Sequence, residues 1–324
     1  MKAAVATEHG LALRDIPQPQ PKPNEVLVKV RAAALNRADL ATARGIPHGS
    51  HGGIGAPVGL EWAGEVVETG AEVQGGFKPG DRVMCSGNGG YAEYAVADWG
   101  RVSAIPANNM SWEQAATLPV ALQTMHNALV TAGRLKAGET VLIQGASSGV
   151  GLMGLQIAKL RDARLVMGTS TNGKRRERLK EFGADLAIDT TQKDWADEVL
   201  KATDKKGVDL IVDQVSASVA NQNLKAAAVL GRIVNVGRLG GFKGEFDFDL
   251  HAMKRIDYIG VTFRTRSLEE VRAIVRVMRA DLWPHVESGK LKLPIDRTFP
   301  LDQAAAALAH MRANAHFGKI VLVA

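Results

Sequence analysis

The first third of the chain consists of short apolar runs bounded by glycine and proline clusters. Strand-like runs cover residues 26–34, 64–70, 81–86, 91–97 and 100–106. Turn-rich stretches at 17–25 and 45–57 separate them. Short runs of this kind with frequent turn signals predict a β-rich unit.

The pattern changes after residue 110. Residues 111–133 have a helical pattern, with Ser111 as the expected N-cap and Gly133 ending the run. From residue 141 onward, apolar strand-like runs alternate with helical ones. Strands are predicted at 141–144, 164–170, 186–190, 208–215 and 232–237, and helices at 148–161, at 173–182, from 195 and up to 229. This alternation predicts a doubly wound parallel sheet of the Rossmann type, with helices on both faces.

The last part of the chain has a third pattern. A long helical run at 267–288 is followed by a strand-like run at 295–300, an alanine-rich helix at 301–313 and a final apolar run. No linker or repeat sets this part off as a domain of its own. We therefore expect two domains, one formed by residues 1–119 and 264–324 and the other by residues 120–263.

Composition narrows the class of protein. With 46% apolar and 23% charged residues, the 324-residue chain is typical of globular proteins, and no apolar run reaches a membrane-spanning length. The first residues lack a signal-peptide pattern, so a cytoplasmic location is expected. The net charge of +6 comes from 40 basic residues interleaved with 34 acidic ones, which does not favour nucleic acid as a partner.

A glycine-rich stretch, GASSGVGLMG, follows the run at 141–144. A literal G-x-G-x-x-G match falls on Gly149, Gly151 and Gly154, but the strand ends at Gln144, so the tight turn must begin at Gly145. In this register Gly154 serves packing alone. The backbone after Gly145 would approach a pyrophosphate, which predicts a dinucleotide site. The residues expected to bind the cofactor here are Gly145, Ser147, Ser148, Gly149, Val150 and Gly151.

Two alternative interpretations of these glycines are less favoured. Glycines after a strand can simply form a tight loop, but strand, turn, helix and a second strand–helix unit coincide here. The stretch also resembles the turn of short-chain dehydrogenases, which depend on Tyr-x-x-x-Lys. None of the three tyrosines of this chain has lysine four positions later, so that family is excluded.

The end of the second predicted strand bears on the choice of cofactor. NAD-binding sites place Asp or Glu there to bind the ribose 2′-hydroxyl, whereas this chain has Thr-Ser-Thr-Asn at 169–172. Ser170, Thr171 and Lys174 are therefore expected to bind a 2′-phosphate, which predicts NADPH. Arg175, Arg176 and Arg178 either join that site or form a solvated helix face.

Further cofactor contacts are expected where later strands end, because ligands of such sheets bind at the carboxyl ends of the strands. The loops at 214–216 and 236–238 follow two of these strands. Gln214, Val236 and Gly237 are the expected contacts.

Several segments together resemble the zinc-free quinone oxidoreductase branch of the medium-chain dehydrogenase/reductase superfamily. They are LNRADL (35–40), GLEWAGEVVETG (59–70), FKPGDRV (77–83), GGYAEYAV (89–96), LPVALQTMHNAL (118–129), LKAGETVLIQGASSGVG (135–151), GVDLIVDQV (207–215) and HFGKIVL (316–322). The resemblance implies a GroES-like catalytic domain (1–119 and 264–324) and an NADPH-binding domain (120–263). It implies hydride transfer from NADPH to a quinone or an activated conjugated carbonyl compound.

The resemblance also implies particular site residues. Zinc alcohol dehydrogenases have cysteine where this chain has Asn36, and histidine where it has Leu60. The eight histidines show no paired spacing and Cys85 is the single cysteine, so no metal is expected. Asn36 is expected to orient substrate or cofactor, with capping of the following helix as the alternative. Thr124, Phe317 and Gly318 are expected near the nicotinamide.

Other activities stay open at this stage. Two tyrosines often found in the branch are replaced, by Ile46-Pro47 and by Thr190, so the substrate is not fixed. An enoyl, enone or carbonyl reductase on the same fold is one alternative. A non-catalytic NADPH-binding protein with a structural or RNA-binding role is another. The run at 255–262 is expected to pair with its copy in a homodimer.

Overall fold

The computed structural model describes residues 1–49 and 52–324. The chain forms two compact units. Unit 1 comprises Met1–Val120 and Phe263–Ala324, and unit 2 comprises Ala121–Thr262. Each unit has a hydrophobic core of its own. Among the described residues, no helix has both the length and the apolar character that crossing a membrane requires.

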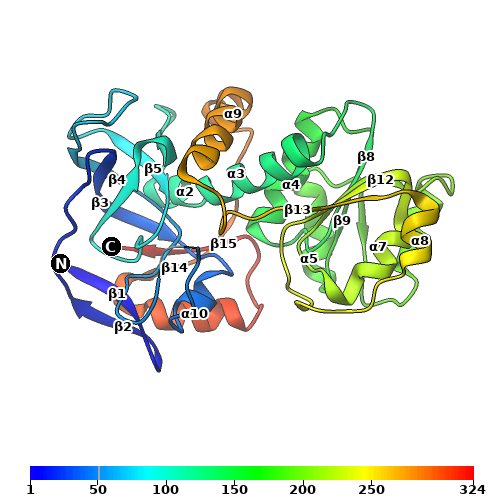
Figure 1. Cartoon of the computed structure of the whole chain (residues 1–324), viewed down its shortest axis with the longest axis horizontal. Coiled ribbons are helices and arrows are strands. Elements are labelled where there is room, and N and C mark those ends of the chain that lie inside the picture. The colour runs from blue at the N-terminus through cyan, green and yellow to red at the C-terminus, as the bar shows by residue number, and fades with distance from the viewer. Residues whose placement is uncertain (50–51) are drawn as a thin grey trace. The chain divides into compact units, whose positions relative to one another are not determined.

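Unit 1 is built on a mixed sheet of seven strands in the order β14-β15-β3-β4-β5-β7, with β6 paired to β3 (Figure 1). Its strands are β3 (Glu25–Ala34), β4 (Glu61–Thr69), β5 (Arg82–Ser86), β6 (Tyr94–Asp98), β7 (Val102–Ala104), β14 (Ile295–Pro300) and β15 (Lys319–Val323). A separate antiparallel hairpin is formed by β1 (Lys2–Thr7) and β2 (Gly10–Asp15). The C-terminal β15 pairs with β3, so the two ends of the sequence share one sheet.

The core of unit 1 lies between this sheet and the C-terminal helix. Fully buried Trp62 and Val28 belong to the same cluster as Ala307, Leu308 and Met311. The helices of this unit are α1 (Asp39–Thr42), α2 (Trp112–Ala116), α9 (Leu268–Glu287) and α10 (Ala304–Arg312). α9 begins with a capping box in which Ser267 and Glu270 bond reciprocally, which stabilises its first turn.

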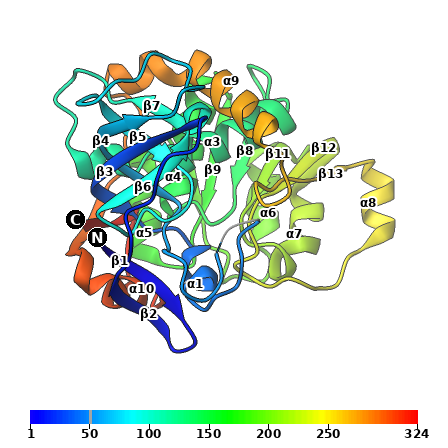
Figure 2. The ribbon, with the colours of Figure 1, turned by 60° about the vertical axis from the view of Figure 1, so that its left-hand side comes forward.

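Unit 2 contains six parallel strands in the order β10-β9-β8-β11-β12-β13 (Figure 2). They are β8 (Thr140–Ile143), β9 (Leu165–Thr169), β10 (Leu186–Ile188), β11 (Val208–Asp213), β12 (Ala227–Asn235) and β13 (Asp257–Gly260). The order reverses between β8 and β11, which is the switch point at which doubly wound sheets bind ligands. The fold class predicted from the sequence is confirmed.

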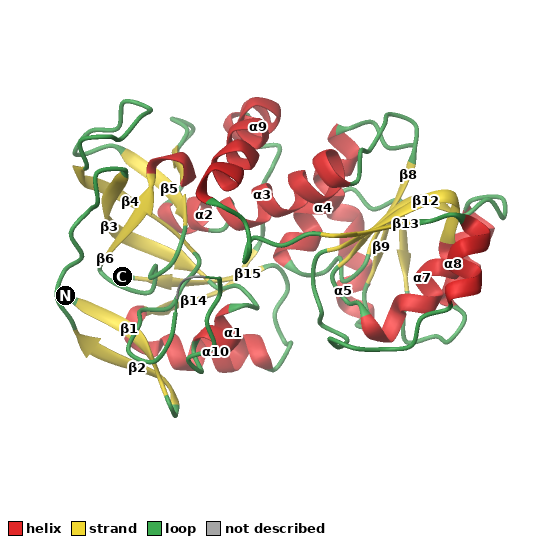
Figure 3. Cartoon of the chain, viewed as in Figure 1, coloured by secondary structure: helices red, strands yellow, loops and turns green. Residues whose placement is uncertain are grey.

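Helices cover both faces of this sheet, as the sequence predicts (Figure 3). Leu142 on β8 packs in one cluster with Val199 and Leu224, whereas its neighbour Ile143 lies on the opposite face beside α4. The helices are α3 (Pro119–His126), α4 (Gly149–Leu160), α5 (Gly173–Glu177), α6 (Trp195–Ala202), α7 (Ala220–Ala226) and α8 (Phe248–Lys254).

Two predicted helices differ most from the structure. The run at 111–133 is not one helix: α2 ends before Thr117, α3 begins at Pro119, and residues Asn127–Ala132 form a π-helix. Proline is favoured at the start of a helix, which explains the new start at Pro119. The helix expected to reach residue 229 ends at Ala226, because β12 already begins at Ala227.

Glycines let α4 approach the strand it follows. A Cβ atom on Gly151 would lie 2.6 Å from Ala146 Cα and 2.7 Å from Gly145 O. Both are backbone atoms, which cannot move aside as the end of a flexible side chain can. A Cβ on Gly154 would meet only the flexible Met125 side chain and Ile143, at 3.0 Å and 3.4 Å. Gly151 therefore sets how closely the helix packs on the turn.

We expect Gly151→Ala to lower the free energy of unfolding by roughly 2–3 kcal/mol, because the added methyl group displaces backbone. Gly154→Ala is the matched control in the same helix. Its better helix propensity offsets the tighter packing, so its effect stays within about 1 kcal/mol. Urea unfolding of both variants makes the comparison. Equal effects of the two substitutions would contradict this packing.

Candidate active site

The turn after β8 has the backbone geometry that the sequence predicts. Gly145 has a φ of 65°, in the left-handed region that favours glycine. Its N–H donates to Thr169 Oγ1 at 3.0 Å, and the N–H of Ala146 donates to Thr169 O at 2.9 Å. The chain therefore reverses at Gly145 and is anchored to the end of β9.

The first turn of α4 offers main-chain donors. Ser148 is the N-cap, and its Oγ accepts from the N–H of Gly151 at 3.0 Å. Gly149 and Val150 begin the helix, so their N–H groups have no carbonyl within it to bind. A helix N-terminus with such donors suits a phosphate, since the helix dipole adds positive potential there. The residues of this turn fit a pyrophosphate.

The end of β9 carries the residues expected to recognise a 2′-phosphate. Ser170 is buried and its Oγ donates to Ser147 Oγ at 3.2 Å, so the structure brings these two hydroxyls together. Thr171 and Lys174 are exposed. Arg176 donates to Ser170 O at 3.0 Å and forms an ion pair with Asp189 at 3.0 Å, which neutralises the carboxylate that follows β10.

The strand ends further along the sheet also meet this turn. Gln214 donates from Nε2 to Gln144 O at 3.0 Å, and Ser148 Oγ donates to Gln214 Oε1 at 3.2 Å. Gly237, after β12, lies so close to Gln214 that a Cβ would be 2.6 Å from its carbonyl oxygen. Val236 is half-buried beside it, and its N–H donates to Asp213 O.

A hollow of about 250 Å³ opens in unit 2 near these strand ends. It is lined by Ser216, Asn235 and Arg238, which follow or end β11 and β12, and by the loop at 241–246. Leu239 lies nearer the turn, with its Cδ1 3.9 Å from where a Gly145 Cβ would be. Its side chain is half exposed, which makes it a further candidate for contact with a bound dinucleotide.

Three expected residues lie elsewhere in the chain. Thr124 is half-buried in α3 of unit 2. Phe317 and Gly318 are buried just before β15 in unit 1, and Gly318 has a φ of 84°. The N–H of Phe317 donates to Asp296 Oδ1 at 3.1 Å.

In unit 1, Asn36 belongs to a buried network of charged groups. Its Nδ2 donates to Glu61 Oε1 at 2.9 Å, and its Oδ1 accepts from Lys319 Nζ at 3.1 Å. Lys319 also forms an ion pair with Glu61 and donates to Leu35 O at 2.9 Å. The alternative that Asn36 caps a helix is wrong: α1 begins at Asp39, and its N-cap, Ala38, makes no side-chain bond.

A second carboxyl group lies beside this network. Asp39 is completely buried, and its Oδ2 accepts from the N–H of Asn36 at 2.7 Å and from Tyr91 Oη at 2.6 Å. Among the described residues, Oδ1 of Asp39 has no hydrogen-bond partner. Burial raises the pKa of Asp39 to about 7, although Tyr91, the Asn36 N–H and the charge of Lys319 oppose that shift.

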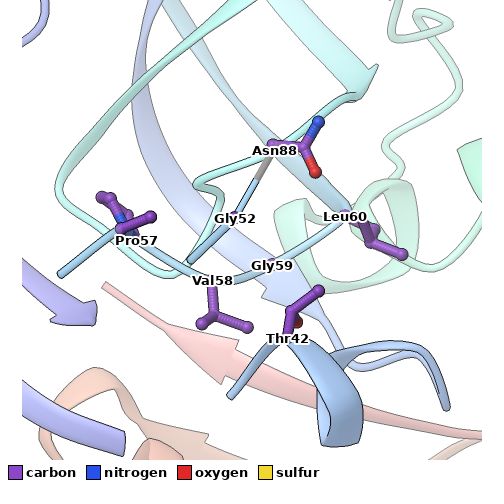
Figure 4. A pocket seen from close by; sticks show the side chains of 8 residues that line it. Thr42, Gly52, Pro57, Val58, Gly59, Leu60 and Asn88 are labelled. Carbon is purple, nitrogen blue, oxygen red and sulfur yellow. The ribbon is translucent and has the colours of Figure 1, made fainter. Parts of the chain in front are cut away.

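A small cavity of about 10 Å³ lies in unit 1, with room for about one water molecule. Figure 4 shows residues that line it: Thr42 at the end of α1, Gly52, the stretch from Pro57 to Leu60, and Asn88 after β5. Leu60, where the zinc enzymes have histidine, is therefore part of its wall.

No group of three or more His, Cys, Asp or Glu side chains in residues 1–49 and 52–324 is arranged to hold a metal ion. Cys85, on β5, is completely buried, and burial raises the pKa of its thiol.

Comparison with known proteins agrees with this arrangement. The alcohol dehydrogenase GroES-like domain model matches residues 22–107, and the zinc-binding dehydrogenase model matches residues 149–279. Human quinone oxidoreductase is 30% identical over 331 residues, covering 100% of this chain and 98% of that protein. A phenolphthiocerol/phthiocerol polyketide synthase of Mycobacterium tuberculosis is 32% identical over 97% of this chain, which spans only 14% of that protein.

Solved structures give the same result. A quinone oxidoreductase of Pseudomonas syringae pv. tomato is 28% identical with a TM-score of 0.87, covering 100% of this chain and 98% of that one. The CurK enoyl reductase is 26% identical with a TM-score of 0.86, covering 99% and 98%. A mycobacterial protein solved in complex with NADPH is 25% identical with a TM-score of 0.87, covering 100% of both chains.

A GroES-like domain combined with a Rossmann sheet is the architecture of medium-chain dehydrogenases/reductases. Within that superfamily, the chain belongs to the quinone oxidoreductase family.

Sequence reasoning did not single out Glu61, Lys319, Asp39 and Tyr91 as a cluster. They come from four separate segments of unit 1, and only the fold brings them together. A usable signal was present for Lys319 alone: it begins a strongly apolar strand, KIVLV, where a charged residue needs a buried partner.

The raised pKa of Asp39 predicts how stability depends on pH. Because the folded chain holds this proton up to about pH 7, whereas an unfolded aspartate loses it near 3.8, the stabilisation from protonated Asp39 is lost as the pH rises between those values. Between pH 5 and pH 8 the loss is about 3 kcal/mol. Asp39→Asn removes this contribution.

Urea unfolding of wild type and Asp39→Asn at both pH values isolates the contribution, since other titrating groups are common to the two proteins. We expect the variant to gain stability relative to wild type at pH 8. A stability difference that is the same at both pH values would show that Asp39 titrates normally.

Proposed function

We propose that the chain is an NADPH-dependent, zinc-independent reductase that transfers a hydride to a quinone or an activated conjugated carbonyl compound. The observation that carries this proposal is the turn after β8. A positive-φ glycine ends the strand, Ser148 caps α4, and Gly151 keeps the helix against the turn. These are the features that a dinucleotide pyrophosphate requires.

Unit 2 is the proposed NADPH-binding domain and unit 1 the proposed catalytic domain. Main-chain donors from Gly145 to Gly151 would bind the pyrophosphate. Gln214, Val236 and Gly237 would contact the dinucleotide at the neighbouring strand ends. From unit 1, Phe317 and Gly318 are proposed to contact the nicotinamide, as the family resemblance implies.

The preference for NADPH is argued from charge. Residues 170–176, directly after β9, include no carboxylate, and Ser170, Thr171 and Lys174 offer hydroxyl groups and a cation. Asp189, the carboxylate after β10, is paired with Arg176 and so would not repel a 2′-phosphate. The mycobacterial relative solved with NADPH supports the same choice. Arg176 is paired with Asp189 and Arg178 with Glu181, so the proposed 2′-phosphate site does not depend on either arginine.

The bound nicotinamide would supply the hydride, and the chain's own residues would orient the acceptor. Lys319 and Glu61 hold the amide of Asn36 in one direction, so Asn36 is proposed to fix substrate or cofactor rather than to transfer a proton. Thr124 is proposed to lie at the nicotinamide. Neither Asn36 nor Leu60 is a thiolate or imidazole donor, so these positions do not fit a catalytic zinc.

A second candidate is an enoyl or enone reductase on the same fold. The similarity to the CurK enoyl reductase and to one segment of a polyketide synthase favours it. The reaction would again place a hydride on a conjugated carbonyl compound. A non-catalytic NADPH-binding role is the remaining alternative.

We further propose a homodimer formed through β13. This strand is the edge of the unit 2 sheet, and Asp257, Tyr258 and Gly260 on it are exposed, so its unpaired backbone can pair with a copy. Light scattering tests this: a mass of one chain at micromolar concentration excludes it. The buried, unpaired Cys85 suits a reducing compartment, which supports a cytoplasmic location.

A substrate panel tests the activity. The protein is incubated with NADPH and, separately, with a set of quinones, 2-alkenals and simple ketones, and NADPH oxidation is followed. Turnover of quinones supports the first proposal, and turnover of 2-alkenals alone supports the second. Oxidation of NADPH with ketones alone would identify a carbonyl reductase. Binding without oxidation by any member of the panel would support the non-catalytic role.

Lys174→Glu tests the coenzyme preference. Replacing a cation by an anion at the proposed 2′-phosphate site should raise the Kd for NADPH roughly tenfold or more, while the Kd for NADH changes less than about twofold. Lys201→Glu, at an exposed position of α6, makes the same change in net charge and is the control. Fluorescence titration measures both constants. Equal weakening of NADPH binding by the two variants would place the phosphate elsewhere.

A further inference from the structure

A continuous chain of buried hydrogen bonds runs beneath the turn after β8. Gly145 N–H donates to Thr169 Oγ1 (3.0 Å), whose hydroxyl donates to Gln144 Oε1 (2.8 Å). Gln144 Nε2 donates to Asn223 Oδ1 (2.7 Å), and Asn223 Nδ2 donates to Asp213 Oδ2 (3.0 Å). The four side chains are at most 1% exposed.

The other oxygen of Asp213 holds the next strand end. Its Oδ1 accepts from the N–H groups of Val215 at 2.7 Å and Ser216 at 2.9 Å. Ser216 has a φ of 70° and a ψ of −120°, a conformation that residues other than glycine rarely adopt. The carboxylate therefore holds a strained residue at the rim of the 250 Å³ hollow.

The donor-to-acceptor direction of all these hydrogen bonds follows from one property of Asp213. An ionised carboxylate can only accept, so Asn223 must present its amide nitrogen to Asp213 and its oxygen to Gln144. Gln144 must then present its own oxygen to Thr169. The hydroxyl proton of Thr169 is consumed in that bond, which leaves its lone pairs to face the N–H of Gly145.

We propose that Asp213 is a positioning residue for the dinucleotide, because it sets the direction of the hydrogen bonds that fix the backbone at Gly145 and holds Ser216 in its strained conformation. This inference rests on the proposed binding of a nicotinamide dinucleotide. Asp213 itself does not touch the ligand. It acts through the backbone at two neighbouring strand ends, where the phosphate turn and the hollow lie.

The hydrogen bonds of Asp213 agree with this role. Burial raises the pKa of its carboxyl group, and hydrogen bonds from Ser216, Val215 and Asn223 oppose that rise. Its three partners are all N–H donors, each of which favours the ionised form. An amide at this position would bring its own NH₂ group against one of those donors, which breaks one side of the network.

The test uses three variants and titration with NADPH. Asp213→Asn should raise the Kd for NADPH about tenfold or more. Asp209→Asn is the matched control. Asp209 lies on the same strand, β11, and accepts two hydrogen bonds from Thr140, but it lies at the opposite end of the strand from Asp213. Its Kd should stay within about twofold of wild type.

The double variant Asp213→Asn with Asn223→Asp restores the donor-to-acceptor direction of the hydrogen bonds. The amide introduced at position 213 could then donate to the new carboxylate at position 223, which would still accept from Gln144. The oxygen of that amide would receive the N–H groups of Val215 and Ser216. We expect the Kd to return to within about threefold of wild type.

A merely structural role would lower the melting temperature of Asp213→Asn without changing the Kd for NADPH. Either that result or a failure of the double variant to rescue binding overturns the inference.

Two further outcomes are decisive. If Asp213→Asn does not fold, Thr169→Val removes the last link with little change of shape, and an unchanged Kd for that variant overturns the inference. If the wild-type chain binds neither NADPH nor NADH, the proposed function fails, and this inference fails with it. Wild-type binding together with unaffected variants would reject the role of Asp213 alone.

Discussion

Lys319 brings an ammonium group into the core of unit 1, where it must be paired. It lies at the start of β15, with Gly318 before it and an apolar strand after it, and it is 3% exposed. An isolated charge at that depth would cost several kcal/mol. The carboxylate of Glu61, the amide of Asn36 and a main-chain carbonyl meet that requirement together, so three strand ends of the unit are tied at one point.

The same requirement has a different solution in unit 2. Here the buried charge is a carboxylate, Asp213, and its hydrogen-bond partners within the described part of the chain include no cation. Its negative charge is spread over N–H donors from the residues that follow β11 and from α7. In unit 1 a buried cation is therefore neutralised by a carboxylate, whereas in unit 2 a buried carboxylate is stabilised by hydrogen bonds from neutral N–H groups. Both arrangements hold the backbone beside residues that are proposed to bind cofactor or substrate. In each unit, the buried charge therefore supports the proposed site.

Much of the fold was predictable from local pattern. The alternation of strand and helix after residue 140 predicted the parallel sheet, because each element carries its own apolar face. The turn at Gly145 was predictable because the predicted strand ends at Gln144, whereas a literal glycine match points to Gly149. The break before Pro119 was not predicted, although a proline at a helix start marks it. The start of β12 at Ala227 was not predicted because pairing with β11, rather than local propensity, sets where this strand begins.

The candidate site was less predictable than the fold. Residues that follow a strand and a glycine turn are neighbours in sequence, so Ser147, Ser148 and Gly151 could be named from spacing. Asn36 could be named only by resemblance, and its bonds to Glu61 and Lys319 join positions 25 and 283 residues away. Leu239 approaches Gly145 from a distant part of the sequence. No periodicity connects such positions, because the fold alone brings them together.

The single thiol of the chain has a consequence for the proposed chemistry. Quinones and conjugated carbonyl compounds are electrophiles that add covalently to thiolates. Cys85 is 0% exposed in the core of unit 1, and its raised pKa keeps it protonated. Cys85 would therefore not be modified by such substrates during turnover.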